Sequence, residues 1–525
     1  MATASDPPGF FAGFGAVAGP LAALVSVWLT TAGHTANFRE MNASHGWISS
    51  VGYGLHSAYL FTIALSILLS PALKHRVQNQ QLAIAGLGLL AIGAFLNGLV
   101  VHASYGVAVF GRVLAGLGAG QVMCACPRCL PEARPGAVKV FEIVLPSFGP
   151  VIVATASMAY GWSDWEGAFL FEGFLALFGL GCVVALTPKP EPLPPTPSSL
   201  AYWPALALGI ACVWYLLQWG HLRGWADDVF VLLVSLVGLV ALITTMWLAW
   251  PSLPAALVRD AVPRGLLVGY AGMVQFFQVS ETGVFGGLFI NVGELDRAWQ
   301  VWPLVFGTAA SLLCGRVLSR PAQLEGKASV IGLWFIAAGM AFLHAKMLGW
   351  PFWRVLNVVE FNWFAAPQTV EMAPGRFLLG FGFGLILQSE MRRSTGDQTH
   401  EGRIGVGLQA AQFIGAGIGI GLLSTALIAG HQYEYSYAAD RGDIQAVEVA
   451  NRTATLQSTI AESGASESAR RAETLMFRSV NYQADALVFA DIYAGFGVSS
   501  AALAVLLMVR IATRNRIGSG AFIRH

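Results

Sequence analysis

The sequence contains little charge for its length. Only 11% of the 525 residues are Asp, Glu, Lys or Arg, whereas soluble domains average about 25%. The mean hydropathy is +0.62, and apolar runs long enough to cross a ~30 Å hydrocarbon core as helices recur from end to end. Alternating ten-residue strands are missing, which argues against a barrel. The sequence therefore predicts an all-α polytopic membrane protein in contact with the lipid bilayer.

Several functional signals are also missing. The net charge of +1 gives no reason to expect nucleic acid as a partner. No Lys or Arg precedes Arg39, so a cleavable signal peptide, which needs a basic start, is not expected. A phosphate-binding loop of the G-x-x-x-x-G-K-[ST] type does not occur, which argues against an ATP-driven pump. The ten histidines form no i, i+4 pair and no Ser-His-Asp signature is present, so neither an enzyme nor a cofactor is expected.

Three of the six cysteines lie close together, at Cys124, Cys126 and Cys129. Closed metal sites rich in cysteine normally need four ligands, and this C-x-C-x-x-C pattern supplies three. No second cluster follows, and Pro127 ends the predicted helix among them. The sequence therefore predicts no metal site.

Hydropathy and turn signals predict fourteen transmembrane helices in a 6 + 2 + 6 arrangement. Residues 1–187 form an N-terminal six-helix bundle, and six prolines between Pro188 and Pro197 make 188–200 a stiff cytoplasmic linker. Residues 201–264 hold two extra helices, and 265–525 form the C-terminal six-helix bundle. The predicted helices are 12–36, 47–69, 82–101, 106–127, 138–160, 168–186, 201–219, 229–249, 265–291, 299–318, 328–347, 375–391, 404–430 and 486–511.

The two predicted bundles repeat part of their sequence. The stretch "GRVLAGLGAGQVM", which contains Arg112, matches "GRFLLGFGFGLIL", which contains Arg376. The preceding helices match as well, in "IAGLGLLAIGAFL" from Ile84 and "VIGLWFIAAGMAFL" from Val330. Repeated bundles that meet at the bilayer midplane are a common plan of secondary transporters.

A charge in the middle of a membrane helix is costly unless it faces the bundle interior and finds a partner. The glycines around Arg112 let neighbouring backbones approach closely. We therefore expect Arg112 to face a central cavity between the bundles. The alternative is a structural arginine whose side chain reaches the membrane interface.

Further motifs carry a family resemblance. Four stretches follow "GRVLAGLGAGQVM" along the chain. They are "FGPV", which includes Gly149 and Pro150, then "LLQWGHLRGWADD", then the loop "GRVLSR", with Gly315, Arg316 and Arg320, and finally "YQADALVFADIY". Together these stretches resemble the major facilitator superfamily, specifically its fourteen-helix drug:H+ antiporter branch of EmrB-like multidrug exporters. The resemblance implies an antiporter signature at Gly149 and Pro150, cytoplasmic gate loops, and a role in proton coupling for Arg112 and its counterpart Arg376.

The sequence departs from this family in places that concern proton-driven antiport rather than the fold. In the first cytoplasmic loop Arg76 fits the family motif, but Pro71 and His75 replace its glycine and aspartate. The family's first helix carries an aspartate, whereas no acid occurs here between Asp6 and Glu40.

Proton coupling therefore requires other carboxylates at membrane depth. Burial favours the protonated form of a carboxyl group, which a reversible proton carrier requires. Glu281, far from both water layers, is the first choice, and Glu172 in the sixth helix is the second. Glu142 and Glu390 are expected in ion pairs near the cytoplasmic interface, and Asp491 is expected as a local contact near the start of the last helix.

Residues 431–485 form the one long predicted extramembrane segment. It contains no proline, Gly464 is placed to end one helix, and Ser466 is placed to cap the next. A periplasmic helical hairpin is expected, with a solvated loop as the alternative. The resemblance implies that this hairpin could dock a periplasmic adaptor (membrane fusion) protein.

The function predicted from these observations is secondary active export of hydrophobic or amphipathic small molecules in exchange for protons, by alternating access. A uniporter or symporter is the alternative within transport, and a membrane-embedded enzyme or a nontransporting receptor or scaffold are alternatives outside it. Lys and Arg concentrate in the short loops of one side, which predicts that both termini lie in the cytoplasm. The family resemblance implies that the membrane is a bacterial inner membrane.

Overall fold

The protein is described by a computed structural model of residues 1–525. The structure describes residues 18–28, 30–31, 41, 44–47, 49–73, 77–100, 104–126, 165–186, 201–249, 255–288, 294–318, 327–347, 367–394, 401–444, 454, 471 and 487–513.

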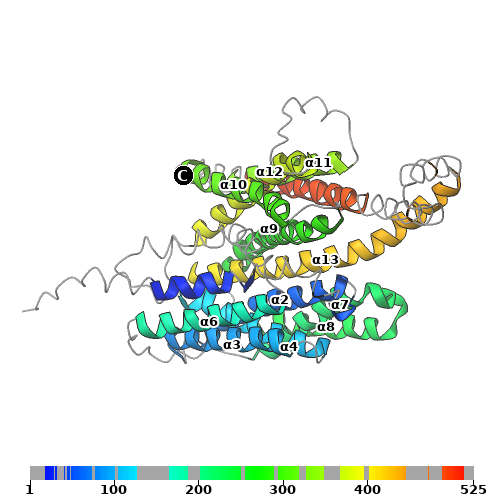
Figure 1. Cartoon of the computed structure of the whole chain (residues 1–525). Coiled ribbons are helices and arrows are strands. Elements are labelled where there is room, and N and C mark those ends of the chain that lie inside the picture. Colours follow the sequence, from blue (N-terminus) through cyan, green and yellow to red (C-terminus); the bar gives the residue numbers. More distant parts are fainter. Residues whose placement is uncertain are drawn as a thin grey trace, which may run out of the picture.

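The described secondary structure is helical throughout and forms two packed halves (Figure 1). The N-terminal half contains the segment Ala18–Trp28, α2 (Ser49–Leu73), α3 (Asn79–Leu99), α4 (Tyr105–Ala125) and α6 (Trp165–Leu186). The extra helices are α7 (Trp203–Trp219) and α8 (Val229–Ala249). The C-terminal half contains α9 (Ala255–Leu288), α10 (Glu294–Leu318), α11 (Lys327–Met347), α12 (Pro367–Ser394), α13 (Glu401–Ile444) and the last helix Leu487–Thr513.

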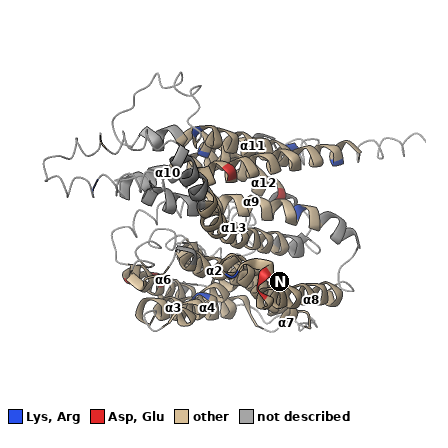
Figure 2. Ribbon diagram, turned by 90° about the vertical axis from the view of Figure 1, so that its right-hand side faces the viewer, with Lys and Arg blue, Asp and Glu red and all other residues tan. Residues whose placement is uncertain are grey.

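The helices have the length and composition of a multi-pass membrane protein. Within the described residues, eight helices are long and apolar enough to cross a membrane, and α4 and α6 are among them. Few residues along the described helices are Lys, Arg, Asp or Glu (Figure 2). The prediction of an all-α polytopic membrane protein is confirmed, and each predicted helix except the fifth has a helix at its position. The fifth, at 138–160, lies outside the described residues.

The sequence repeat appears as the same helix contact in both halves. A Cβ at Gly86 of α3 would lie 2.7 Å from the carbonyl oxygen of Gly118 of α4. A Cβ at Gly332 of α11 would meet Gly382 of α12 at the same distance. The missing side chains let these backbones approach closely. The pairs α3–α4 and α11–α12 are therefore equivalent parts of the two halves.

This packing predicts that adding one methyl group lowers the stability of the protein at one glycine of α3 and not at another. In Gly93→Ala, the new Cβ would collide with the carbonyl oxygen of Gly111, and overpacking of this kind costs about 1–3 kcal/mol. Gly88→Ala in the same helix is the matched control, because nothing lies within 4 Å of its Cβ position. That change should be neutral or slightly stabilising, since Ala favours helix over Gly. Thermal unfolding of both variants in detergent tests this, and equal unfolding midpoints would contradict it.

The two halves meet along α2 and α13, which pack against each other (Figure 1). The Trp28 ring lies 6.1 Å from the Phe413 ring of α13, and the His56 ring of α2 lies 6.5 Å from the Phe276 ring of α9. Aromatic side chains therefore make up part of the contact between the halves.

Helix α7 contacts both halves. Its Trp214 Nε1 donates to the carbonyl oxygen of Gly54 on α2 at 2.9 Å. On the other side, Thr425 Oγ1 of α13 donates to the carbonyl oxygen of Leu217 at 3.1 Å. After α7 the chain turns back into α8, and Asp228 accepts from the backbone N–H of Phe230 at 2.7 Å. That backbone hydrogen bond, together with Arg223, holds the pKa of Asp228 below its ordinary value. Helix α7 thus lies against the contact between the halves, and α8 packs against α7.

Several helices extend further than hydropathy predicts, and among them α12 begins at Pro367 rather than 375. Helix α9 begins at Ala255 rather than 265, and α13 continues to Ile444 rather than ending at 430. A helix satisfies its own backbone hydrogen bonds, so it can continue past the apolar stretch into water. Residues 431–444 therefore continue α13, and the helical hairpin over 431–485 stays a prediction. The rest of 431–485 lies outside the described residues, apart from Ala454 and Arg471.

Candidate functional site

Arg112 lies on α4, the helix with the most glycines in the N-terminal half. Helix α4 begins after Ser104, whose side chain caps it by accepting from the backbone N–H of Val107 at 3.3 Å. Cβ atoms at Gly116 and Gly120 would collide with side chains of α2. The glycines thus bring α4 close to α2 and α3, and Arg112 is fully buried between its neighbours.

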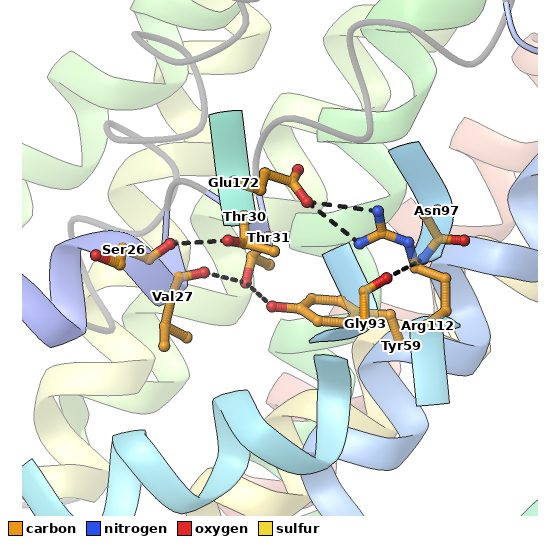
Figure 3. A network of polar contacts seen from close by, with 9 residues as sticks. All are labelled: Ser26, Val27, Thr30, Thr31, Tyr59, Gly93, Asn97, Arg112 and Glu172. Atoms are coloured by element: carbon orange, nitrogen blue, oxygen red, sulfur yellow. Dashed lines mark hydrogen bonds and ion pairs between the residues drawn. The ribbon is translucent and has the colours of Figure 1, made fainter. Parts of the chain in front are cut away.

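The Arg112 guanidinium forms an ion pair with Glu172 of α6. Its Nη2 and Nη1 atoms lie 3.4 and 3.5 Å from Glu172 Oε2, and Figure 3 shows the two groups pointing toward each other. The side chains are 0% and 1% exposed. Both helices are candidate membrane spans. The pair therefore places a carboxylate and a fixed cation inside the bundle, at membrane depth.

Two aromatic rings lie beside the guanidinium. The Cζ atom of Arg112 is 4.2 Å from the ring centre of Phe169 and 5.8 Å from that of Tyr59. Phe169 and Glu172 are three residues apart on α6, so they lie on the same face of the helix. Tyr59 comes from α2 on the side of the other half. Both distances lie within the ~6 Å range of a cation–π interaction.

Hydroxyl groups connect the ion pair to the first helix. Tyr59 Oη lies 3.2 Å from Thr31 Oγ1, which donates to the carbonyl oxygen of Val27 at 2.9 Å. Ser26 Oγ donates to the carbonyl oxygen of Leu175 on α6 at 2.9 Å. The first helix is thus bonded to α2 through Thr31 and Tyr59 (Figure 3), and it is bonded to α6, which carries Glu172, through Ser26.

His56 lies between the ion pair and the contact between the halves. It is fully buried on α2, one turn before Tyr59. Its ring lies 6.4 Å from that of Tyr59 and 6.5 Å from that of Phe276 in the other half. A row of rings therefore leads from Arg112 to the C-terminal half.

A second charged cluster lies within the C-terminal half. Arg264 Nε of α9 lies 2.9 Å from Glu390 Oε2 of α12, and Ser329 Oγ of α11 donates to Glu390 Oε1 at 2.7 Å. The sequence suggested an ion pair for Glu390 but not this partner. Because Arg264 and Ser329 lie near the starts of their helices and Glu390 near the end of its own, this cluster joins one end of the three helices.

The predicted site residues are brought together in part. Arg112 and Glu172 form the pair described above, and Arg376 is 1% exposed on α12, at the position equivalent to Arg112. Glu281 lies within α9, but its side chain is outside the described residues. The expectation that Arg112 faces a central cavity and the choice of Glu281 as proton carrier therefore stay predictions.

The motif residues that were carried over from the family resemblance lie mostly outside the described part of the chain. This applies to Arg76, Gly149, Pro150 and Arg320. Gly315 and Arg316 lie within the backbone of α10, and nothing is described of the Arg316 side chain.

Sequence reasoning missed the two aromatic residues beside Arg112. For Phe169 a signal existed, because it stands three residues before Glu172 on a predicted helix. For Tyr59 the chain offered none, since its place beside Arg112 depends on how α2 packs against α4.

The arrangement suits reversible protonation. A carboxylate beside a permanent cation is stable when ionised, and the same carboxyl group is stable without charge in an apolar surrounding. Within the described residues no cluster of three or more His, Cys, Asp or Glu could hold a metal ion.

No protein-family model and no curated protein matches the chain. Solved structures do match it along most of its length. One is described as an auto-inhibited POT family peptide transporter, with a TM-score of 0.57 and 14% identity, covering 94% of this chain and 96% of the other. Another is described as a D-xylose-proton symporter, with a TM-score of 0.52 and 14% identity, covering 79% and 90%. The chain therefore has the major facilitator fold.

Proposed function

We propose that this protein is a proton-coupled secondary transporter that moves a small organic molecule across the membrane by alternating access. The observation that carries the proposal is the buried Arg112–Glu172 pair. Replacing such a pair by apolar residues is often neutral or stabilising, so stability alone does not account for it. Ionisable groups inside a membrane bundle are by default candidates for ion pathways.

In this proposal Glu172 carries the proton. When it is ionised, its attraction to Arg112 holds α6 against α4. Protonation removes the carboxylate charge and weakens that attraction, and the proton leaves from the same carboxyl oxygen in the opposite state of the cycle. The Ser26–Leu175 and Thr31–Tyr59 hydrogen bonds then connect a shift of α6 to the first helix and to α2, which packs against α13 of the other half.

The proposed substrate class is an amphipathic small molecule, and the proposed direction is export. Support comes from the family resemblance and from aromatic rings where the halves meet, since the Phe413 ring lies 6.1 Å from that of Trp28 and 6.4 Å from that of Phe276. Symport is the second candidate, because the fold is shared with a protein described as a proton symporter. The export proposal includes the docking of a periplasmic adaptor protein on residues 431–485.

The test is flux in proteoliposomes that contain a trapped pH-sensitive dye. A fluorescent lipophilic cation and a sugar are added separately under pH gradients of either sign, with protein-free vesicles and a protonophore as controls. Proton movement opposite to the lipophilic cation is expected. Movement of protons together with a substrate would replace antiport by symport. Substrate flux that causes no proton flux, or no flux above the control vesicles, would contradict the proposal.

A further inference from the structure

Helix α7 packs against α2 of one half and against α13 of the other. One apolar cluster includes Phe61 of α2 and Ile418 of α13, and its members on α7 run from Trp203 to Leu217, over most of the helix. Alternating access moves the two halves apart at one end of the bundle at a time. A helix that is attached to both halves must therefore release one of them when the end at which it is attached opens.

Two hydrogen bonds join α7 to these helices within its last two turns. Trp214 Nε1 donates to the carbonyl oxygen of Gly54 on α2 at 2.9 Å, and the carbonyl oxygen of Leu217 accepts from Thr425 Oγ1 of α13 at 3.1 Å. Lipid tails can replace apolar contacts between helices at little cost, but they offer no hydrogen-bonding groups. Hydrogen bonds therefore decide how firmly α7 holds each half at this end of the bundle.

Several side chains hold the end of α7 against the N-terminal half. Besides the bond from Trp214, Gln218 is fully buried beside Gly54, where a Cβ would lie 2.5 Å from the Gln218 Cδ atom. The Gln218 side chain thus fills the space that this glycine leaves. The ring of Trp219 meets that of Tyr105, at the start of α4, edge to face at 5.9 Å. Three side chains of α7 therefore contact α2 and α4.

The attachment of α7 to the C-terminal half includes the hydroxyl group of Thr425. Threonine hydroxyls in helices commonly bond to a carbonyl group one turn back in their own helix, as those of Thr62 and Thr244 do. Thr425 instead bonds to Leu217, in the last turn of α7, where carbonyl groups have no partner within the helix. In the contacts that the structure describes, a single hydroxyl group thus bonds α13 to α7.

We propose that α7 moves with the N-terminal half, and that the Thr425–Leu217 hydrogen bond is a latch that holds the halves together at the end of the bundle where α7 ends. The latch breaks when this end opens and forms again when it closes. It favours the closed state of this end, so α7 controls how much of the open state is populated. This inference rests on the proposed function, because it requires alternating access.

The first test asks which half α7 follows. Leu222, in the turn after α7, Tyr433 of α13 and Leu99 at the end of α3 are 41%, 71% and 66% exposed. Spin labels are introduced there in pairs as noncanonical amino acids, which leaves the native cysteines in place. Pulsed EPR in proteoliposomes, at acidic and at neutral pH, should give two distances for Leu222–Tyr433 and one for Leu222–Leu99. Two distances for Leu222–Leu99, or one for Leu222–Tyr433, would overturn the proposal.

The second test removes the latch alone. Thr425→Val deletes the hydroxyl group and keeps the branched shape, so the population with the longer Leu222–Tyr433 distance should rise about 3-fold, a typical effect of one hydrogen bond between membrane helices. Thr425→Ser keeps the hydroxyl group and should resemble the parent. Thr244→Val on α8 is the matched control, since that hydroxyl group donates to Val240 of its own helix at 2.8 Å. Unchanged populations in Thr425→Val would overturn the latch.

The third test loosens the other attachment. Trp214→Phe removes the indole N–H that bonds to α2, so a second Leu222–Leu99 distance should appear. Trp203→Phe, at the start of α7, is the matched control and should leave one distance, because the Trp203 indole nitrogen has no hydrogen-bond partner within the described residues. If the two variants behave alike, the Trp214 hydrogen bond does not hold α7 to the N-terminal half, and the proposal is wrong.

Failure of this inference differs from failure of the proposed function. Coupled flux in the parent together with a single Leu222–Tyr433 distance would overturn the latch and leave proton-coupled transport intact. A parent without coupled flux would overturn the proposed function itself.

Discussion

Glu172→Gln is expected to reduce proton-coupled flux to the level of protein-free vesicles while the protein remains folded. Glutamine has nearly the same shape as glutamate and can still accept a hydrogen bond from Arg112, but it cannot take up or release a proton. Substrate exchange without a pH gradient should persist, because the variant resembles the protonated state permanently. Proton flux and exchange measured on the same vesicles test this expectation.

Two matched variants show whether the effect belongs to Glu172. Glu166→Gln, in the first turn of the same helix, should retain coupling. Glu281→Gln tests the residue that hydropathy favours as proton carrier. If Glu281→Gln abolishes coupling and Glu172→Gln retains it, the proton site lies on α9 and the assignment to the Arg112–Glu172 pair is wrong.

Arg112→Leu is expected to destabilise the protein by about 3–5 kcal/mol, since it leaves the Glu172 carboxylate buried without its cation. The double variant Arg112→Leu/Glu172→Leu should recover most of this loss, because apolar side chains replace both charges. It should have no coupled flux. Unfolding in detergent gives the stabilities, and a double-mutant cycle gives the interaction energy of the pair.

The control for this cycle is the exposed ion pair between Arg223 and Asp228, whose side chains are 47% and 26% exposed. Arg223→Leu should leave the stability unchanged within error, because solvent screens that pair. If the double variant at 112 and 172 is as unstable as Arg112→Leu, the loss comes from packing around Arg112 and not from an uncompensated charge.

Sequence alone determined the class of protein, the order of its helices and its internal repeat. Apolar runs mark membrane helices because the bilayer allows few alternatives for the backbone. The glycines around Arg112 also predicted a close approach of neighbouring backbones, and such an approach occurs at Gly86 and Gly118 and again at Gly332 and Gly382. These features are local or depend on comparing two stretches of one chain. The length of α13 was not predictable in this way, because hydropathy reports the membrane and not the end of a helix.

Tertiary structure decided which charges and rings meet. Arg112 and Glu172 were each identified as candidates, but nothing in the chain joins residues 60 positions apart. Their contact arises because α3 packs against both α4 and α6, which brings two long side chains within reach. Tyr59 arrives from α2 for a similar reason, through the glycines of α4. A buried charge needs a partner, so the sequence predicts that one exists, whereas the packing of the helices determines its identity.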